Sequence, residues 1–187
     1  MESIDCIICN SSNLSDYKKI QDTHDSDTFF NLSKCDCGFI FLNPRPDENE
    51  MSKYYDESYL PHTSKKNFFN MIYNLIQKVT FFWKWSILRK KSYKLNSLLD
   101  IGGGSGNFSK FLKNKGVNAY NYDPYFKNDG NISTDRKYDV ITLWHSLEHI
   151  HDVKKIFSKI NSSLSNKGVL YIAIPNHDAY ERSYFEE

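Results

Sequence analysis

The hydrophobic positions of this chain change their spacing along its length, and the changes divide it into three parts. Residues 1–46 form a segment that carries the cysteines, and residues 47–96 form an aromatic and basic connector. Residues 97–187 alternate short apolar runs with stretches of helical periodicity. This last pattern predicts strands and helices in turn, and therefore an α/β domain.

The connector contains apolar residues at steps of three and four, which places them on one face of a long amphipathic helix. The face consists of Phe68, Met71, Ile72, Leu75, Ile76, Val79, Phe82 and Trp83. Because lysines and arginines surround it, the helix over residues 66–91 could also lie against an anionic membrane surface as a peripheral contact. Covering the sheet or closing a substrate cleft is the commoner use of such a helix, and the sequence favours that use.

The third part predicts a series of strand, helix and strand units. Strands are expected at residues 97–101, 117–122, 138–143 and 168–174. The first helix is marked by Phe108, Phe111 and Leu112 and ends at Lys115 and Gly116. The second carries Val153, Ile156, Phe157, Ile160 and Leu164 and ends near Lys167 and Gly168. We therefore expect a Rossmann-like, doubly wound parallel sheet with a ligand site beyond the carboxyl ends of its strands.

A glycine-rich turn between the first strand and the first helix is the strongest chemical signal. It consists of Asp100, Ile101, Gly102, Gly103, Gly104, Ser105 and Gly106. Glycines let the backbone turn sharply and let a ligand approach closely, and the helix N-terminus supplies N–H donors. A dinucleotide fingerprint needs a third glycine where Asn107 stands, and no P-loop Gly-Lys pair follows the turn. The carboxylate of Asp100 suits a ligand with an ammonium group, such as S-adenosylmethionine, and would repel a pyrophosphate.

Asp123 closes the next predicted strand. An acidic residue at this place can accept hydrogen bonds from both ribose hydroxyls of a nucleotide. The alternative is a turn residue before Pro124. The distance of Asp123 from the glycine turn along the sequence favours the ribose role.

At this point the sequence resembles class I S-adenosylmethionine-dependent methyltransferases. The resemblance covers roughly residues 98–176 and rests on residues 100–106, Asp123, "YDVITLWHSLEHIHD" and "LSNKGVLYIAIPN". It implies a cofactor whose methionine end lies near Asp100 and Gly102, with its ribose at Asp123 and a wall formed by Trp144 and His145. The expected cofactor-binding set is therefore Asp100, Gly102, Gly104, Gly106, Asp123, Trp144 and His145.

Two features depart from the pattern of this family. The interval after Asp123 is short, so residues 132–135 are the only candidate for a third strand and the contacts to adenine. The family's sheet also adds two strands beyond the one that ends at Ile174. We therefore expect a domain truncated at its C-terminus.

His145, Glu148 and His149 form an H-x-x-E-H pattern, which on a helix could bind zinc as in inverzincin peptidases. The strand that runs into His145 argues against that geometry. In a methyltransferase, His149 or His145 could instead act as the base that accepts a proton from the acceptor. The alternative is that Glu148 and His149 only hold the loop through hydrogen bonds.

All four cysteines lie near the start of the chain, as Cys6-x-x-Cys9 and Cys35-x-Cys37. The favoured interpretation is tetrahedral structural Zn²⁺, with disulfides and unligated thiols as alternatives. The run "KCDCGFIFLNPRP" also resembles a zinc-ribbon segment that precedes some bacterial methyltransferases of sugar, polysaccharide or natural-product pathways. Because only Asp36 separates the second pair, we expect strain there, and His24 could replace one ligand.

Composition narrows the choice of function. The net charge of +1 gives no global field for nucleic acid, so none is expected as a partner. The start of the chain lacks a secretory signal, which favours a cytoplasmic location, and no run approaches the roughly 18 apolar residues of a membrane span. The main hypothesis is methyl transfer to a small molecule, such as a sugar or natural-product intermediate. The rivals are an NAD-dependent oxidoreductase and a non-catalytic zinc-containing binding module on a degenerate Rossmann scaffold.

Overall fold

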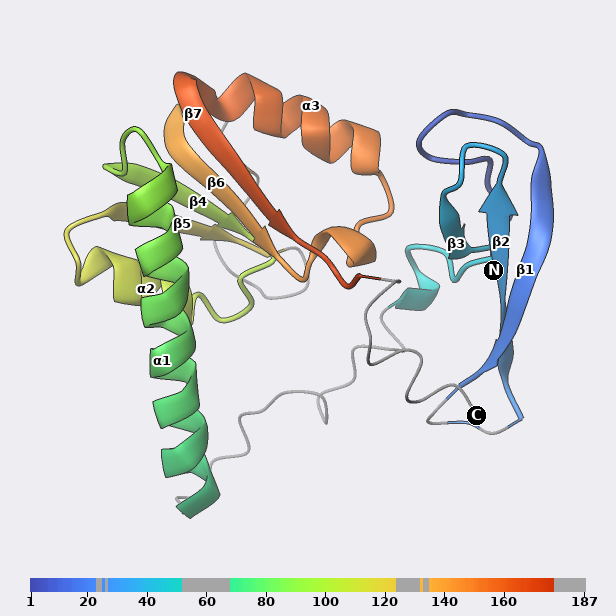
Figure 1. The fold of residues 1–187 in the computed structure, drawn as a ribbon, viewed down its shortest axis with the longest axis horizontal. Coiled ribbons are helices and arrows are strands. Elements are labelled where there is room, and N and C mark those ends of the chain that lie inside the picture. The colour runs from blue at the N-terminus through green and yellow to red at the C-terminus, as the bar shows by residue number, and fades with distance from the viewer. Residues whose placement is uncertain (23–24, 26, 52–67, 124–131, 133–134, 177–187) are drawn as a thin grey trace. The chain divides into compact units, whose positions relative to one another are not determined.

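The computed structural model describes residues 1–22, 25, 27–51, 68–123, 132 and 135–176 (Figure 1). The chain divides into two compact units, Met1–Ser64 and Lys65–Glu187. Each unit has its own sheet and is described by itself below.

The first unit is built on three antiparallel strands in the order β1-β2-β3. The strands are β1 (Leu14–Gln21), β2 (Phe29–Cys35) and β3 (Ile40–Leu42). Leu14 pairs with Cys35 at one end of this sheet, and Lys34 pairs with Ile40 next to the turn into β3. The pairing brings the start of β1 and the end of β2 together, which is where the two cysteine pairs lie.

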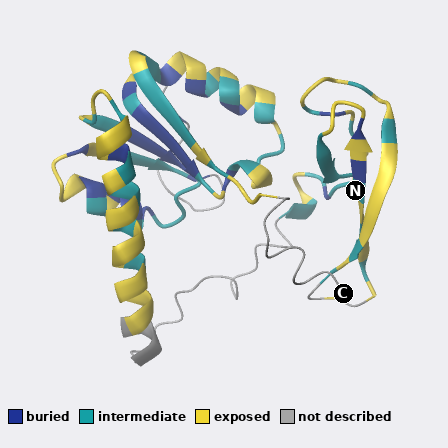
Figure 2. Cartoon of the chain, viewed as in Figure 1, coloured by how far each residue is buried: buried dark blue, intermediate teal, exposed yellow. Residues whose placement is uncertain are grey.

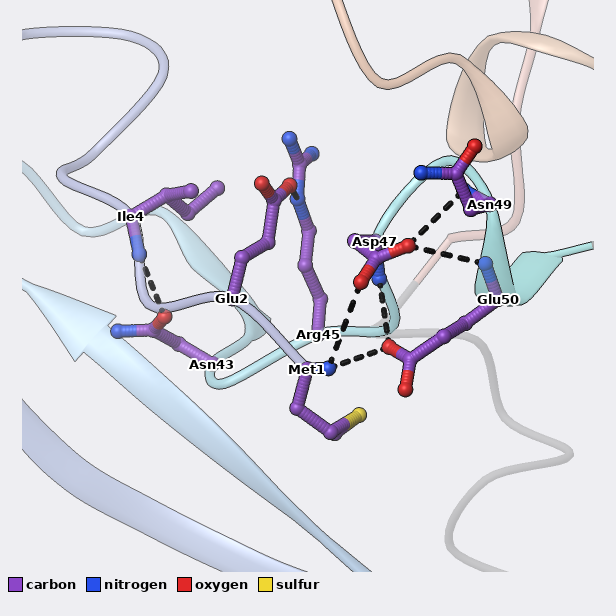
Figure 3. A network of polar contacts seen from close by, with 8 residues as sticks. All are labelled: Met1, Glu2, Ile4, Asn43, Arg45, Asp47, Asn49 and Glu50. Carbon is purple, nitrogen blue, oxygen red and sulfur yellow. Dashed lines mark hydrogen bonds and ion pairs between the residues drawn. The ribbon is translucent and has the colours of Figure 1, made fainter.

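Polar contacts tie the first residues of the chain to the segment that follows β3. Figure 3 shows the network formed by Met1, Glu2, Ile4, Asn43, Arg45, Asp47, Asn49 and Glu50. Glu2 and Arg45 form a backbone bridge, and their side chains form a salt bridge with an N–O distance of 2.7 Å. The side chain of Asn43 accepts a hydrogen bond from the amide of Ile4 at 3.0 Å. The segment leading to Cys6 is therefore held at a fixed place.

The second unit contains a parallel four-stranded sheet in the order β5-β4-β6-β7. Its strands are β4 (Ser97–Ile101), β5 (Asn118–Tyr122), β6 (Tyr138–Trp144) and β7 (Leu164–Ala173). Its helices are α1 (Phe68–Lys91), α2 (Asn107–Lys113), the short 3-10 helix η3 (Leu147–His149) and α3 (Val153–Ser163). Among the described helices, none has the length and apolarity to cross a bilayer.

Helices cover both faces of this sheet, with α1 and α2 on one face and α3 on the other (Figure 1). Successive strand residues point to opposite faces. Leu98 and Val140 accordingly pack with Leu88 of α1 and with α2, whereas Leu99 and Ile141 pack with α3. The predicted doubly wound parallel sheet is confirmed.

The predicted boundary between the last helix and the last strand is wrong by about four residues. The helix was expected to reach Lys167, but α3 ends at Ser163, and Leu164 already pairs with Tyr138 of β6. The pairing then shifts register before Val140 meets Val169. A Cβ atom on Gly168 would lie 2.3 Å from Leu164 Cδ2, so the chain folds tightly over the Leu164 side chain. Leu164 therefore begins β7 and does not belong to the helix, to which its spacing had assigned it.

The prediction that the long helix covers the sheet with its regular apolar residues is wrong for Ile72, Leu75, Ile76 and Val79, whereas its use in closing a substrate cleft stays a prediction. Ile72, Leu75, Ile76, Val79, Phe82 and Trp83, which we call the outer stripe, do share one face of α1, but that face is exposed. Phe81, Trp85 and Leu88 pack on the sheet instead. Figure 2 shows the exposure along α1, and Figure 1 shows its first half extending beyond the carboxyl ends of the strands. The side chains of residues 68–71 lie outside the described part.

Two leucines of α1 give a direct test of which face carries the stability of this unit. Leu88 is fully buried, whereas Leu75 is 63% exposed. We expect Leu88→Ala to lower the free energy of unfolding by about 2–4 kcal/mol because it leaves a cavity. Leu75→Ala should change it by less than about 0.5 kcal/mol. Urea unfolding followed by circular dichroism measures both, and equal losses would mean that the outer stripe is packed in solution.

Candidate functional site

Asp100 lies near the carboxyl end of β4, between Asn121 of β5 and Thr142 of β6 in the sheet register. Its side chain is 2% exposed, and Oδ1 accepts a hydrogen bond of 2.7 Å from the Thr142 hydroxyl. Burial raises the pKa of Asp100 to about 6, although the Thr142 hydrogen bond and the charge of Lys84 oppose this rise. A desolvated carboxylate of this kind favours a cationic group of a ligand as its partner.

The glycine turn that follows β4 passes closely over neighbouring side chains. Gly102 has a φ of +76°, and a Cβ atom there would lie 2.2 Å from Ser146 Cβ. The Ser146 hydroxyl donates a hydrogen bond of 2.8 Å to the carbonyl of Ile101, which joins the ends of β4 and β6. A Cβ atom on Gly103 would lie 2.4 Å from Asp100 Oδ2 and 2.2 Å from Asn121 Oδ1. Side chains thus fill the space beneath the turn, so both positions require glycine.

Several backbone amides of the turn are bonded within the protein. The amide of Gly102 donates to the Tyr122 carbonyl at 2.7 Å, and that of Gly106 donates to the Gly103 carbonyl at 3.0 Å. The amide of Gly104 donates to Asp123 Oδ2 at 2.8 Å. Within the residues that the structure describes, the amides of Gly103 and Ser105 have no hydrogen-bond partner. Within the turn itself, these are the two amides that a ligand above it would meet.

Asp123 is brought to the same turn, as the sequence predicted. It directly follows β5, its side chain is 8% exposed, and its hydrogen bond to Gly104 fixes its orientation. Its charge also raises the pKa of Asp100 after the larger effects of burial, Thr142 and Lys84. The two aspartates are therefore electrostatic neighbours on either side of one bend. Pro124, on which the turn alternative rested, lies outside the described residues.

Lys84 is a site residue that sequence reasoning missed. It lies on the inner side of α1, and its ammonium stands 4.7 Å from the centroid of the Trp144 ring and 5.4 Å from that of Phe108. Burial lowers the pKa of Lys84, and the negative charge of Asp100 opposes this effect. Lys84 and Asp100 are far apart in sequence, so no local spacing could have linked them.

The histidine pattern does not form a metal site. His145 stands at the end of β6 with a φ of +52°, and His149 belongs to the separate helix η3. The imidazole Nδ1 of His145 is 3.8 Å from Glu148 Oε1, and its side chain is 65% exposed. Among the described residues, only the four cysteines form a cluster with metal-ligand geometry. The peptidase hypothesis is therefore wrong for this arrangement, and both histidines stay exposed at the carboxyl end of β6.

Two residues of the predicted third strand, Ile132 and Asp135, are described, and neither lies in a strand, since Asp135 is part of a turn. Ile132 is buried in the core with Leu99, Ile101 and Tyr138. Residues 133–134 lie outside the described part of the chain. A role of residues 132–135 in binding adenine stays a prediction.

A family model matches the unit that carries this site. A family described as "Methyltransferase domain" matches residues 69–187. This chain belongs to that family of methyltransferase domains. The comparison with curated proteins returns no match.

Among solved structures, one similar chain is described as "Crystal structure of the plantazolicin methyltransferase BpumL in complex with pentazolic desmethylPZN analog and SAH". The two chains are 20% identical with a TM-score of 0.41, and the match covers 76% of this chain and 58% of that one. The present methyltransferase-domain chain thus spans less than two thirds of that neighbour.

The cysteines of this family member lie before the region that the family match covers. Their four sulfur atoms all lie within 4.8 Å of one another. Cys6 Sγ is 3.6 Å from Cys37 Sγ, and Cys9 Sγ is 3.5 Å from Cys35 Sγ. Tetrahedral Zn²⁺ with bonds of about 2.3 Å places its sulfur ligands roughly 3.8 Å apart, so the spacing fits this ion. His24, the proposed replacement ligand, lies outside the described residues.

Backbone donors surround the cysteine sulfurs. Burial raises the pKa of the Cys6 thiol, but N–H donors from Cys9 and Ile8 outweigh it and lower the pKa to about 7. Cys9, Cys35 and Cys37 each accept a backbone hydrogen bond from the residue two positions on. Such donors favour thiolate, which is the form that binds zinc. Burial and the neighbouring thiols nevertheless leave the pKa of Cys9, Cys35 and Cys37 raised, so only Cys6 has a lowered pKa.

A tighter turn accommodates the second cysteine pair, Cys35 and Cys37, for which the sequence predicted strain. Asn10 donates to the carbonyl of Cys6 at 2.8 Å, and Gly38 donates to that of Cys35 at the same distance. Asn10 and Gly38 follow the second cysteine of each pair, and their φ angles are +59° and +92°. The two turns therefore have the same design, and the second is one residue shorter because it is a hairpin between β2 and β3.

Proposed function

We propose that this chain binds S-adenosylmethionine and transfers its methyl group to a small molecule. The observation that carries the proposal is the pair of acidic side chains, Asp100 and Asp123, on either side of a glycine turn at the ends of neighbouring strands. In an open α/β sheet this edge is where ligands bind. Membership in a family of methyltransferase domains supports the same reaction.

We assign the two aspartates to different parts of the cofactor. Asp100, desolvated and bonded to Thr142, receives the ammonium of the methionine end. Asp123 receives the ribose hydroxyls, since a carboxylate can accept several hydrogen bonds besides the one from Gly104. Gly102, Gly104 and Gly106 complete the proposed cofactor-binding set because the turn needs their positive φ angles.

The chemistry needs little from the protein beyond positioning. When bound, S-adenosylmethionine supplies an electrophilic methyl group on a sulfonium, and its thioether leaves without an acid. The acceptor atom forms a bond to the methyl carbon as the carbon–sulfur bond breaks, and an acceptor hydroxyl gives its proton to a base. We propose His149 or His145 as this base, and Trp144 with His145 as the wall of the site, because they gather at the end of β6.

We further propose that the acceptor is a sugar or another intermediate of a polysaccharide or natural-product pathway. The support is the resemblance of "KCDCGFIFLNPRP" to the segment that precedes methyltransferases of such pathways. The nicotinamide alternative is weaker because the buried Asp100 carboxylate under the turn would repel a pyrophosphate.

We propose in addition that Cys6, Cys9, Cys35 and Cys37 bind one structural Zn²⁺ ion. Four thiolates leave no open coordination position, so the ion stabilises the first unit and takes no part in the reaction. The sulfur spacing and the lowered pKa of Cys6 support this assignment over disulfides.

The first prediction from this proposal concerns the pH dependence of cofactor binding. S-adenosylhomocysteine keeps its ammonium charge between pH 5 and 7, whereas Asp100 takes up a proton as the pH falls through about 6. We therefore expect the Kd from calorimetry to rise by up to about tenfold per pH unit below that value. Asp100→Asn should weaken binding at pH 7.5 by about 10- to 100-fold and remove most of this pH dependence.

Thr142→Val provides the control for this prediction. Its hydroxyl lowers the pKa of Asp100, so the variant should move the loss of affinity to higher pH while keeping the carboxylate. A chain that binds NADH but not S-adenosylhomocysteine would contradict the proposed cofactor.

The second prediction concerns the metal. Protein purified without chelator should contain about one Zn²⁺ per chain by mass spectrometry of the metal. Cys37→Ser should lower the zinc affinity by about 100-fold, because the roughly 10–16 kcal/mol of structural zinc binding is shared among four ligands. Asp36→Ala changes the neighbouring exposed residue and should keep the full zinc content. Zinc-free protein with two disulfides in reducing buffer would refute the assignment.

A further inference from the structure

The ammonium of Lys84 lies among aromatic rings near Asp100. It stands over the rings of Trp144 and Phe108, and burial lowers its pKa. A lysine ammonium offers three N–H donors. In the described part of the chain, Lys84 makes neither a hydrogen bond nor an ion pair within 4.0 Å, although it feels the charge of Asp100. Desolvated cations normally have such a partner.

Two neutral groups near Lys84 and Asp100 are also unsatisfied. Trp144 Nε1 is a buried donor and Asn121 Oδ1 a buried acceptor, and neither has a partner among the described residues. Trp144 lies against Lys84, and Asn121 Oδ1 lies beside Asp100 Oδ2 under Gly103. The unsatisfied donors of the site are therefore Lys84 Nζ and Trp144 Nε1. Its acceptors are the Asp100 carboxylate and the unpaired Asn121 Oδ1.

We propose that Lys84 binds the carboxylate of the methionine end of the cofactor. This inference rests on the proposed function and extends it to a residue outside the turn. An amino acid is a zwitterion, so its ammonium meets Asp100 while its carboxylate meets Lys84. The rings of Trp144 and Phe108 hold the lysine in place through cation–π contacts. The absence of a direct ion pair between Lys84 and Asp100 leaves both charges available to the two ends of the zwitterion.

Two ligands that differ only in this carboxylate test the inference. We expect Lys84→Met to weaken the binding of S-adenosylmethionine by about 10- to 100-fold, and that of decarboxylated S-adenosylmethionine by less than about twofold. Removing Lys84 raises the pKa of Asp100, so the calorimetry is done at pH 8, above the Asp100 pKa of about 6, to keep this carboxylate ionised in both proteins. Lys84→Arg keeps the charge and should restore part of the affinity.

Lys78→Met removes an exposed lysine of the same helix and should change neither affinity. Equal losses for both ligands in Lys84→Met, or no loss, would overturn the role of Lys84. Wild-type protein that binds neither ligand would instead contradict the proposed function, so the two failures are distinct.

The outer stripe of α1 carries a second inference independently. Its residues follow steps of three, one, three, three and one, and those from Ile72 to Val79 face away from Phe81, Trp85 and Leu88. At the end of the stripe, Phe82 contacts Phe111 and Trp83 contacts Trp144, with ring centroids 5.1 Å and 6.2 Å apart. Exposure ranges from 39% for Ile72 to 63% for Leu75 and Val79. A contiguous apolar surface of this kind marks a contact site.

Charge decides which partner fits this surface. The helix contains no acidic residue, and besides Lys84 of the proposed site it carries four cations: Lys78, Arg89, Lys90 and Lys91. Pairing with a second copy would bring two such helices together and cost repulsion, whereas an anionic surface is attracted. Ile72, Leu75, Ile76 and Val79 offer an exposed apolar face to the headgroup region. We propose that the outer stripe of α1 rests on an anionic lipid surface.

Vesicle flotation tests this proposal on the full chain. We expect binding to vesicles of phosphatidylcholine with about 30% phosphatidylglycerol, and weaker binding to phosphatidylcholine alone or at high salt. Val79→Asp should reduce binding by about tenfold or more, since it places a charge in the stripe. Asn74→Asp adds the same charge to an exposed position off the stripe and should reduce it less. No flotation, equal effects of both variants, or a dimer that Val79→Asp dissociates would overturn the proposal.

Discussion

The second unit is organised around one carboxylate that is removed from water. Asp100 is central in the sheet, and a buried charge must be compensated or it is expensive to keep. Thr142 supplies one hydrogen bond, and the cation of Lys84 supplies attraction at longer range. These two interactions compensate the buried charge only in part, as the rise of the Asp100 pKa to about 6 indicates. An ammonium group brought by a ligand would complete it, so the fold holds Asp100 in a state that binding improves.

The same carboxylate explains why the turn is made of glycine. A side chain at Gly103 would meet Asp100 and Asn121, and one at Gly102 would meet Ser146. Glycine signatures are usually explained by the ligand above the turn. Here the side chains beneath the turn require glycine as strongly. A glycine motif alone therefore identifies a close-packed turn, and the two flanking aspartates give it chemical meaning.

Local patterns predicted the strands, the parallel sheet and the approach of Asp123 to the turn, because those features depend on spacing within a few residues. β4 matches its predicted range, and the fold class is confirmed. Features that depend on distant contacts were not predictable. Leu164 has helical spacing but pairs with Tyr138 in the sheet, and Lys84 reaches Trp144 from a different element. The short cysteine pair was judged strained because the hairpin that shortens its turn is a tertiary feature of β2 and β3.

The long helix shows how one periodic pattern can be assigned to the wrong surface. Its regular apolar residues suggested a core face, but the sheet is contacted by Phe81, Trp85 and Leu88, whose spacing is equally helical. One and two turns before Phe81, the same face carries Gln77 and Asn74. The inner face of α1 thus changes from apolar to polar where the helix passes the ends of the strands. Lys84 stands beside this change, close enough to the core to lose water and close enough to Asp100 to feel its charge. The opposite face carries the exposed part of the outer stripe from Ile72 to Val79, so α1 is polar toward the ends of the strands and apolar on its far side.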